Sequence, residues 1–153
     1  MLSEDLWVKL ISNSPHETEA IGFKIGKMLK AGDIVGLYGD LGTGKTTMVK
    51  GLAAALGIDR RDVTSASFTI IAEYRSNPPL YHIDLYRIEN VGDLDSTGIW
   101  DCLGKNSISV IEWAEKLGDA LPEGLIKVRI DDKGDGIREI SIEGIHEEDR
   151  HNL

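Results

Sequence analysis

Gly39-Asp40-Leu41-Gly42-Thr43-Gly44-Lys45-Thr46 follows the pattern G-x-x-x-x-G-K-[ST], which is typical of a phosphate-binding loop (P-loop). Glycines let such a loop curl until its backbone N–H groups converge on phosphate oxygens. The lysine places its charge on the β- and γ-phosphates, and the final hydroxyl ligates the Mg²⁺ that bridges them. We therefore expect Lys45 to be an exposed loop lysine with a catalytic role and Thr46 to be a metal ligand. The expected nucleotide-binding residues are Asp40, Leu41, Gly42, Thr43, Gly44, Lys45, Thr46 and Thr47.

The flanks of the loop agree with this interpretation. Residues 33–38 are mostly apolar and predict a short buried strand that enters the loop. A helix is expected to start near Gly44 or Lys45, and Gly57 supplies a left-handed stop for it. Its apolar residues recur at helical spacing, at Met48, Val49, Leu52, Ala53 and Leu56. We expect an α/β fold: a P-loop NTPase three-layer sandwich with a mainly parallel, mixed central sheet and antiparallel hairpins.

The length, charge and cysteine content of the chain limit its possible functions. The chain has 153 residues, 17 basic and 26 acidic side chains and a formal net charge of −9, which argues against unaided binding to a nucleic-acid backbone. A single cysteine, Cys102, excludes an intrachain disulfide, and no apolar run is long enough to span a membrane. We expect a cytoplasmic protein with one domain at 1–145 and a frayed tail at 146–153. There is no room for an effector domain, so ATP turnover is expected to act mainly on another polypeptide.

Other segments predict the elements around the loop. A strand is expected at 6–11, followed by a helix that opens with the capping box Ser14-Pro15-His16-Glu17 and ends at Gly32. Two antiparallel hairpins are expected, formed by 68–75 with 80–87 and by 125–130 with 137–142. Between them, residues 92–103 predict a short helix and loop, in which Trp100 and Leu103 are expected to be buried.

Two strands carry candidate acids. Alternation in 80–87 puts His82, Asp84 and Tyr86 on one face, which is either a catalytic wall or a solvated outer face. Strand 107–113 is apolar and delivers Glu112 at its end, as expected for an acid that reaches Mg²⁺ or the attacking water. Alternatively, Glu112 caps the short helix that follows. We expect Asp84 and Glu112 to be catalytic and to hold the metal.

Three strings then resemble one family in their order and spacing: G-D-L-G-T-G-K-T-T at 39–47, H-I-D-L-Y-R at 82–87 and I-E-W-A-E at 111–115. They resemble the bacterial TsaE family over nearly the whole chain. The resemblance implies an ATPase required for threonylcarbamoyladenosine formation in tRNA, which uses ATP/ADP and Mg²⁺ and acts with TsaB and TsaD. It implies contact with tRNA only through that complex, and it places Trp113 close to the nucleotide.

One segment departs from the family pattern. The family usually has S-P-T-F where this chain has Ser65-Ala66-Ser67-Phe68, so a hydroxyl is kept while the rigid proline is lost. The stretch 64–67 is either a switch loop that reaches the γ-phosphate or an ordinary surface connector.

Other P-loop functions remain as alternatives. A small-molecule kinase would use Arg87 to clamp the transition state and Asp84 to activate the hydroxyl of an acceptor, although no arginine-rich lid is evident. A nucleotide-dependent assembly module would do negligible chemistry. The [NT]-K-x-D string for guanine selection is absent, which favours ATP over GTP.

Overall fold

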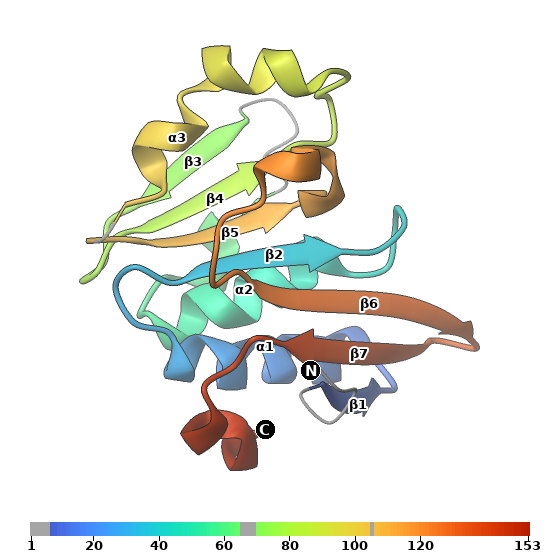
Figure 1. The fold of residues 1–153 in the computed structure, drawn as a ribbon. Coiled ribbons are helices and arrows are strands. Elements are labelled where there is room, and N and C mark those ends of the chain that lie inside the picture. Colours follow the sequence, from blue (N-terminus) through green and yellow to red (C-terminus); the bar gives the residue numbers. More distant parts are fainter. Residues whose placement is uncertain (1–6, 65–69, 105) are drawn as a thin grey trace.

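The computed structural model describes residues 7–64, 70–104 and 106–153. In it, a mixed sheet has the strand order β1-β7-β6-β2-β5-β4-β3. The central strands β6, β2, β5 and β4 run parallel, while β3, β7 and β1 add antiparallel pairs at the two edges (Figure 1). The strands are β1 Val8–Ser12, β2 Ile34–Tyr38, β3 Ile71–Tyr74, β4 Leu80–Asp84, β5 Ile108–Glu112, β6 Ile126–Gly134 and β7 Ile137–Glu143.

Two long helices lie side by side on one face of this sheet (Figure 1). These are α1 Pro15–Met28 and α2 Lys45–Ala55. The remaining helices are short: η2 Arg60–Asp62, η3 Val91–Thr97, α3 Ile99–Cys102, η4 Ala114–Ala120 and η5 Glu147–Asn152. No helix in the described ranges is long and apolar enough to cross a membrane.

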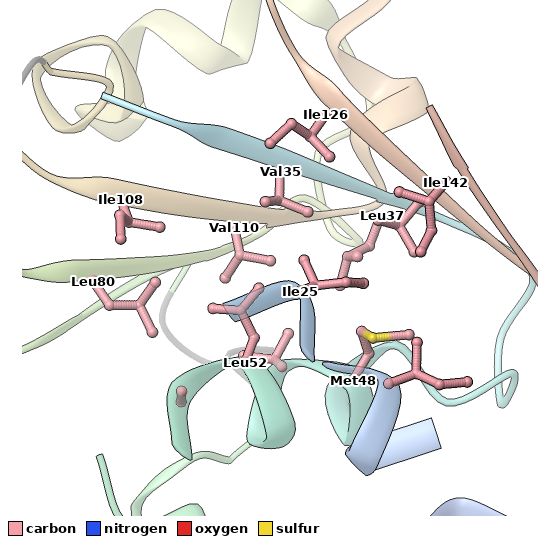
Figure 2. Close-up of a cluster of buried hydrophobic side chains, with 14 of the residues drawn as sticks. Ile25, Val35, Leu37, Met48, Leu52, Leu80, Ile108, Val110, Ile126 and Ile142 are labelled. Carbon is pink, nitrogen blue, oxygen red and sulfur yellow. The ribbon is translucent and has the colours of Figure 1, made fainter. Parts of the chain in front are cut away.

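The main core lies between the sheet and the two long helices. Met48 and Leu52 of α2 and Ile25 of α1 point toward the strands and are almost completely buried (Figure 2). Because each fully buried aliphatic side chain stabilises the fold by about 1.5–3 kcal/mol, this face anchors α2 firmly to the sheet. The sheet contributes Val35, Leu37, Leu80, Ile108, Val110, Ile126 and Ile142.

The opposite face of the sheet carries a second core under the short helices. Ile83 of β4 and Ile111 of β5 pack there against Leu94 of η3, Ile99 of α3 and Leu117 of η4. Tyr81 and Leu85 belong to the same cluster as Ile83, so the predicted alternation along this strand is confirmed. The sheet is therefore covered on both faces where β4 and β5 lie, and these two strands are buried.

The first helix begins as predicted and ends earlier. The Ser14 side chain accepts from the Glu17 N–H, and Pro15 occupies the first turn. The expected end at Gly32 is wrong, because Leu29 already has extended backbone angles and Gly32 (φ 99°) belongs to a separate turn. A carboxylate oxygen of Asp33 accepts from the Lys30 N–H at 2.7 Å and stabilises that turn.

Two other expectations, the burial of Trp100 and the length of the terminal hairpin, need correction. Trp100 is not buried: its side chain is 39% exposed, and its indole N–H donates to Asp95 at 2.9 Å. The expected frayed tail at 146–153 stays a prediction; in the structure it contains η5, and Leu153 packs against the main core. The terminal hairpin is longer than predicted, because β6 continues to Gly134 before the turn.

Candidate functional site

The predicted phosphate loop connects β2 to α2, as the sequence indicated. Gly39 and Gly44 have φ angles of 148° and 108°, which an L side chain rarely adopts. Gly44 is the N-cap of α2, and no side chain caps this helix end. The first-turn N–H groups of an α-helix lack intrahelical partners and favour anions. The loop therefore presents backbone donors at the positive end of a helix that the main core holds in place.

Lys45 is buried rather than exposed, which corrects the expectation for this residue. Only 5% of it is accessible, and its Nζ donates to the carbonyl oxygens of Gly39 at 2.5 Å and Asp40 at 2.8 Å. The same Nζ lies 4.1 Å from the centre of the Trp113 indole ring, within the range of a cation–π interaction. Burial lowers the pKa of Lys45, while the charge of Glu112 acts in the opposite direction. The ammonium is thus held inside the loop by neutral oxygens and an aromatic face.

The next residue joins the loop to the predicted acid. Thr46 Oγ1 lies 3.2 Å from both carboxylate oxygens of Glu112. Strands β2 and β5 are parallel neighbours with Leu37 aligned to Glu112, so the loop after β2 and the end of β5 meet at the same edge of the sheet. Glu112 is only 3% exposed. Its carboxylate is therefore a buried hydrogen-bond acceptor placed beside the hydroxyl of the loop.

The neighbouring strand β4 adds two more polar side chains. His82 Nε2 lies 2.6 Å from Oε2 of Glu112, and Asp84 is aligned with Glu112 in the β4–β5 register. Both side chains are buried, which is inconsistent with the alternative of a solvated outer face. Burial raises the pKa of Asp84, while its hydrogen bond from the Tyr86 N–H acts against that rise. Tyr86 itself lies beyond the strand and is exposed.

A cavity of about 520 Å³ collects most of the predicted site residues. Trp113 lies at its wall with φ 60°, a left-handed conformation that costs an L residue about 1–2 kcal/mol. This conformation ends β5 and begins η4, and the indole packs against the Tyr86 ring with the centroids 5.2 Å apart. The lining residues are Leu41, Gly42, Gly44, Lys45, Thr46, Thr47, Asp84, Tyr86, Glu112 and Trp113.

A second cavity of about 260 Å³ lies on the other side of the loop. Arg138 of β7 contributes to it and donates from Nε to the Thr43 carbonyl at 3.0 Å, while Asp132 holds its guanidinium at 2.9 Å. Sequence reasoning missed Arg138, because its partner Thr43 lies 95 positions away and no motif marks it. The lining residues are Ser14, Pro15, Thr18, Gly42, Thr43, Gly44, Thr47, Gly136 and Arg138.

Two predicted features fall outside these cavities. Asp40 contributes its backbone carbonyl to Lys45 and Thr43, and its side chain lines neither cavity. The expected switch loop at 64–67, with the Ala66 departure, lies outside the described residues apart from Thr64. The structure therefore brings together Lys45, Thr46, Asp84 and Glu112, with Trp113 at their side.

The chain is similar to known proteins along most of its length. Residues 12–140 match the family model described as threonylcarbamoyl adenosine biosynthesis protein TsaE. A tRNA threonylcarbamoyladenosine biosynthesis protein TsaE from Treponema pallidum is 37% identical over 88% of this chain and 99% of its own length. The protein of the same name from Bacillus subtilis is 39% identical over 86% of this chain and 82% of its own length. A crystal structure of Bacillus subtilis YdiB superimposes with a TM-score of 0.74 at 33% identity, covering 95% of this chain and 90% of the other.

The family match covers the loop, both acid-bearing strands and the strand that carries Arg138, so it includes every side chain of the two cavities. The resemblance seen in three short strings thus extends along most of the chain. This protein belongs to the TsaE family of tRNA threonylcarbamoyladenosine biosynthesis proteins.

Proposed function

We propose that this chain binds ATP with Mg²⁺ and hydrolyses it to ADP and phosphate, and that this cycle supports threonylcarbamoyladenosine modification of tRNA by a TsaB–TsaD complex. The observation that carries the proposal is the meeting of Lys45, Thr46 and Glu112 at one cavity beside the N-terminus of α2. The fold is then best described as a P-loop NTPase three-layer sandwich. Membership of a tRNA-modifying family supplies the process that the cycle serves.

The side chains suit a magnesium nucleotide. Mg²⁺ prefers hard oxygen ligands and usually takes one or two carboxylates together with substrate phosphates. The Thr46 hydroxyl and the carboxylates of Glu112 and Asp84 are such ligands, and all three residues line the larger cavity. When bound, the ion would neutralise charge that develops on the phosphates. The phosphates would lie in the larger cavity against the loop, and the nucleoside would extend toward the smaller cavity beside Arg138 and Thr18.

In the proposed reaction each site residue has its own role toward the phosphates, the metal or the attacking water. Lys45 would exchange the Gly39 and Asp40 carbonyls for β- and γ-phosphate oxygens, because an anion is a stronger partner for an ammonium than a neutral carbonyl. Glu112 and Asp84 would hold the metal and orient the attacking water. Both acids are buried, where electrostatic interactions are stronger than in bulk water. Trp113 would keep Lys45 in place through the contact between its ring and the ammonium.

The proposed docking site for the partner complex is the surface around the larger cavity. Leu41 is 73% exposed and Tyr86 is 45% exposed, and both line that cavity. Contiguous exposed apolar patches mark protein–protein interaction sites, and we propose that these two side chains belong to such a patch. The net charge of −9 disfavours direct contact with tRNA, so the complex would provide it. In this proposal the chain is a cytoplasmic subunit with weak basal activity that rises when TsaB–TsaD docks.

A reconstituted modification assay tests the proposal. Phosphate release and modified adenosine per transferase are followed over time with TsaB, TsaD, tRNA and either the parent or Lys45→Ala. We expect phosphate release to rise when TsaB–TsaD is added, and repeated rounds of modification to require the parent protein. Lys45→Ala should lose most Mg²⁺–ATP affinity in calorimetry, because it removes the ammonium of the loop.

The contradicting results are specific. ATP binding by Lys45→Ala as tight as that of the parent would show that the loop is not the phosphate site. Multiple rounds of modification without this protein, or with Lys45→Ala in its place, would show that its ATP cycle does not serve the pathway.

A further inference from the structure

His82 has no assigned part in the site, yet it makes one of the shortest contacts there. Its side chain is fully buried on β4, between the strand that carries Glu112 and the hairpin partner β3. Nε2 lies 2.6 Å from Oε2 of Glu112, while Nδ1 has no hydrogen-bond partner among the described residues. A buried polar atom without a partner costs roughly 1–3 kcal/mol, so a histidine kept only for packing would be a poor choice here.

The contacts of Glu112 show what the imidazole does. Oε2 of Glu112 lies within hydrogen-bond distance of both His82 Nε2 and Thr46 Oγ1. Within the described part of the chain, Oε1 has only Thr46 Oγ1 as a partner. A metal-binding glutamate is an ionised carboxylate, which only accepts hydrogen bonds, so in the proposed site Nε2 of His82 is the donor of this short contact. The imidazole therefore holds one oxygen of Glu112 and leaves the other beside the loop hydroxyl.

We propose that His82 is a positioning residue for Glu112, which holds its carboxylate next to Thr46 so that Mg²⁺ meets a preset ligand. This inference rests on the proposed function, since it assigns a residue that supports the same metal site. A glutamate has several rotatable bonds, and fixing them before the metal arrives lowers the entropy cost of binding. Hydrogen bonds to ligating carboxylates typically change metal affinity by 10–100-fold.

Calorimetry with ADP, in the presence of Mg²⁺ and in its absence with a chelator, separates positioning from packing. In His82→Leu, which keeps an apolar side chain in the buried space, we expect the gain in ADP affinity from Mg²⁺ to fall by roughly 10-fold or more. The metal-free ADP affinity should stay unchanged, because His82 makes no direct hydrogen bond to the loop or to Lys45 within the described part of the chain. His82→Gln should recover part of the gain, since its amide nitrogen can donate near the position of Nε2.

Ser109→Ala is the matched control. Ser109 is also buried in the β4–β5 pair, with no partner for its hydroxyl among the described residues, and it makes no contact with Glu112. Ser109→Ala should show the same gain in ADP affinity from Mg²⁺ as the parent. An unchanged Mg²⁺ effect in His82→Leu, with the parent responding to Mg²⁺, would overturn the positioning role. A parent that binds ADP equally with and without Mg²⁺ would instead contradict the proposed metal site.

A second measurement needs no nucleotide and no variant that must fold. Nitrogen chemical shifts of the ¹⁵N-labelled histidine rings in the metal-free parent report which ring nitrogen carries the proton. We expect His82 to carry a proton on Nε2 that exchanges slowly with water, because the group is buried against Glu112. A ring with a bare Nε2 would show that it donates nothing to Glu112, and the inference would fail.

Discussion

Thr46 and Glu112 lie 66 positions apart in the chain, yet the hydroxyl of one is 3.2 Å from both carboxylate oxygens of the other. The contact joins the start of α2 to the end of β5, and it is here that we propose a cation binds. A buried carboxylate in this position can either hold the metal or orient water, and both roles require its negative charge.

Glu112→Gln keeps the size of the side chain and removes the charge. We expect nucleotide still to bind, because Lys45 and the loop are intact, while phosphate release falls at least roughly tenfold, or about 1.4 kcal/mol of barrier. Single-turnover phosphate release measures this, with the exposed Glu123→Gln as the control that should behave like the parent. If Glu112→Gln and Asp84→Asn both release phosphate at the parental rate, neither acid takes part in hydrolysis.

Asp84→Asn should stabilise the nucleotide-free protein at neutral pH. Burial raises the pKa of Asp84 in the folded state, so ionising this group costs more in the folded than in the unfolded chain. The ionised Asp84 therefore destabilises the parent. This destabilisation has its full size at pH values above the raised pKa, and it disappears at pH values below the ordinary pKa of 3.8. The advantage of the variant should therefore shrink as pH falls through this window.

Urea unfolding of the parent and of Asp84→Asn, from pH 7 down to pH values below that window, tests this expectation. The exposed Asp119→Asn serves as the control and should show no such trend. A variant that is less stable than the parent at pH 7 would mean that the charge of Asp84 stabilises the fold.

Trp113→Phe should abolish the change in tryptophan fluorescence when ADP binds. Trp113 lines the larger cavity and lies over Lys45, which in the proposed function would move when phosphate replaces the loop carbonyls. Trp100 is bonded to Asp95 outside both cavities, and Trp7 lines a separate hollow with Arg129. A signal that persists in Trp113→Phe would assign the response to Trp7 or Trp100.

Gly51→Ala should destabilise the fold although alanine favours helices by about 1 kcal/mol. A Cβ at Gly51 would lie 1.9 Å from the carbonyl oxygen of Glu19, so α1 and α2 would have to separate. We expect a net loss of about 1–3 kcal/mol in urea unfolding, which is the usual cost of overpacking. Gly92→Ala is the control: nothing lies within 4 Å of its added Cβ, and its unfolding free energy should change little. Equal stability of the two variants would disprove the close approach of α1 and α2.

Much of the site could be predicted because its parts are local. The loop pattern, the strand before it and the helix after it are contiguous, and each follows from hydrophobic spacing and glycine positions. Glu112 was also accessible to prediction, since an apolar strand that ends in an acid is itself a local pattern. These features depend on backbone conformations that neighbouring residues largely determine.

Other features were decided by tertiary structure. The end of α1 at Met28, the exposure of Trp100 and the burial of Lys45 each depend on what packs against the residue, and helical spacing does not encode that. The same holds for the bond from Arg138 to the Thr43 carbonyl, which requires β7 and the loop to meet.

The sequence by itself determined that a loop with the phosphate-binding pattern, two acids and an α/β sheet are present, because hydrophobic periodicity and motif spacing are properties of short segments. Only the tertiary structure decided that His82 lies against Glu112 and that Arg138 closes a second cavity. The physical reason is that strand order and register set these distances. Both arise from the packing of the whole sheet against its helices, to which residues far apart in the chain contribute together.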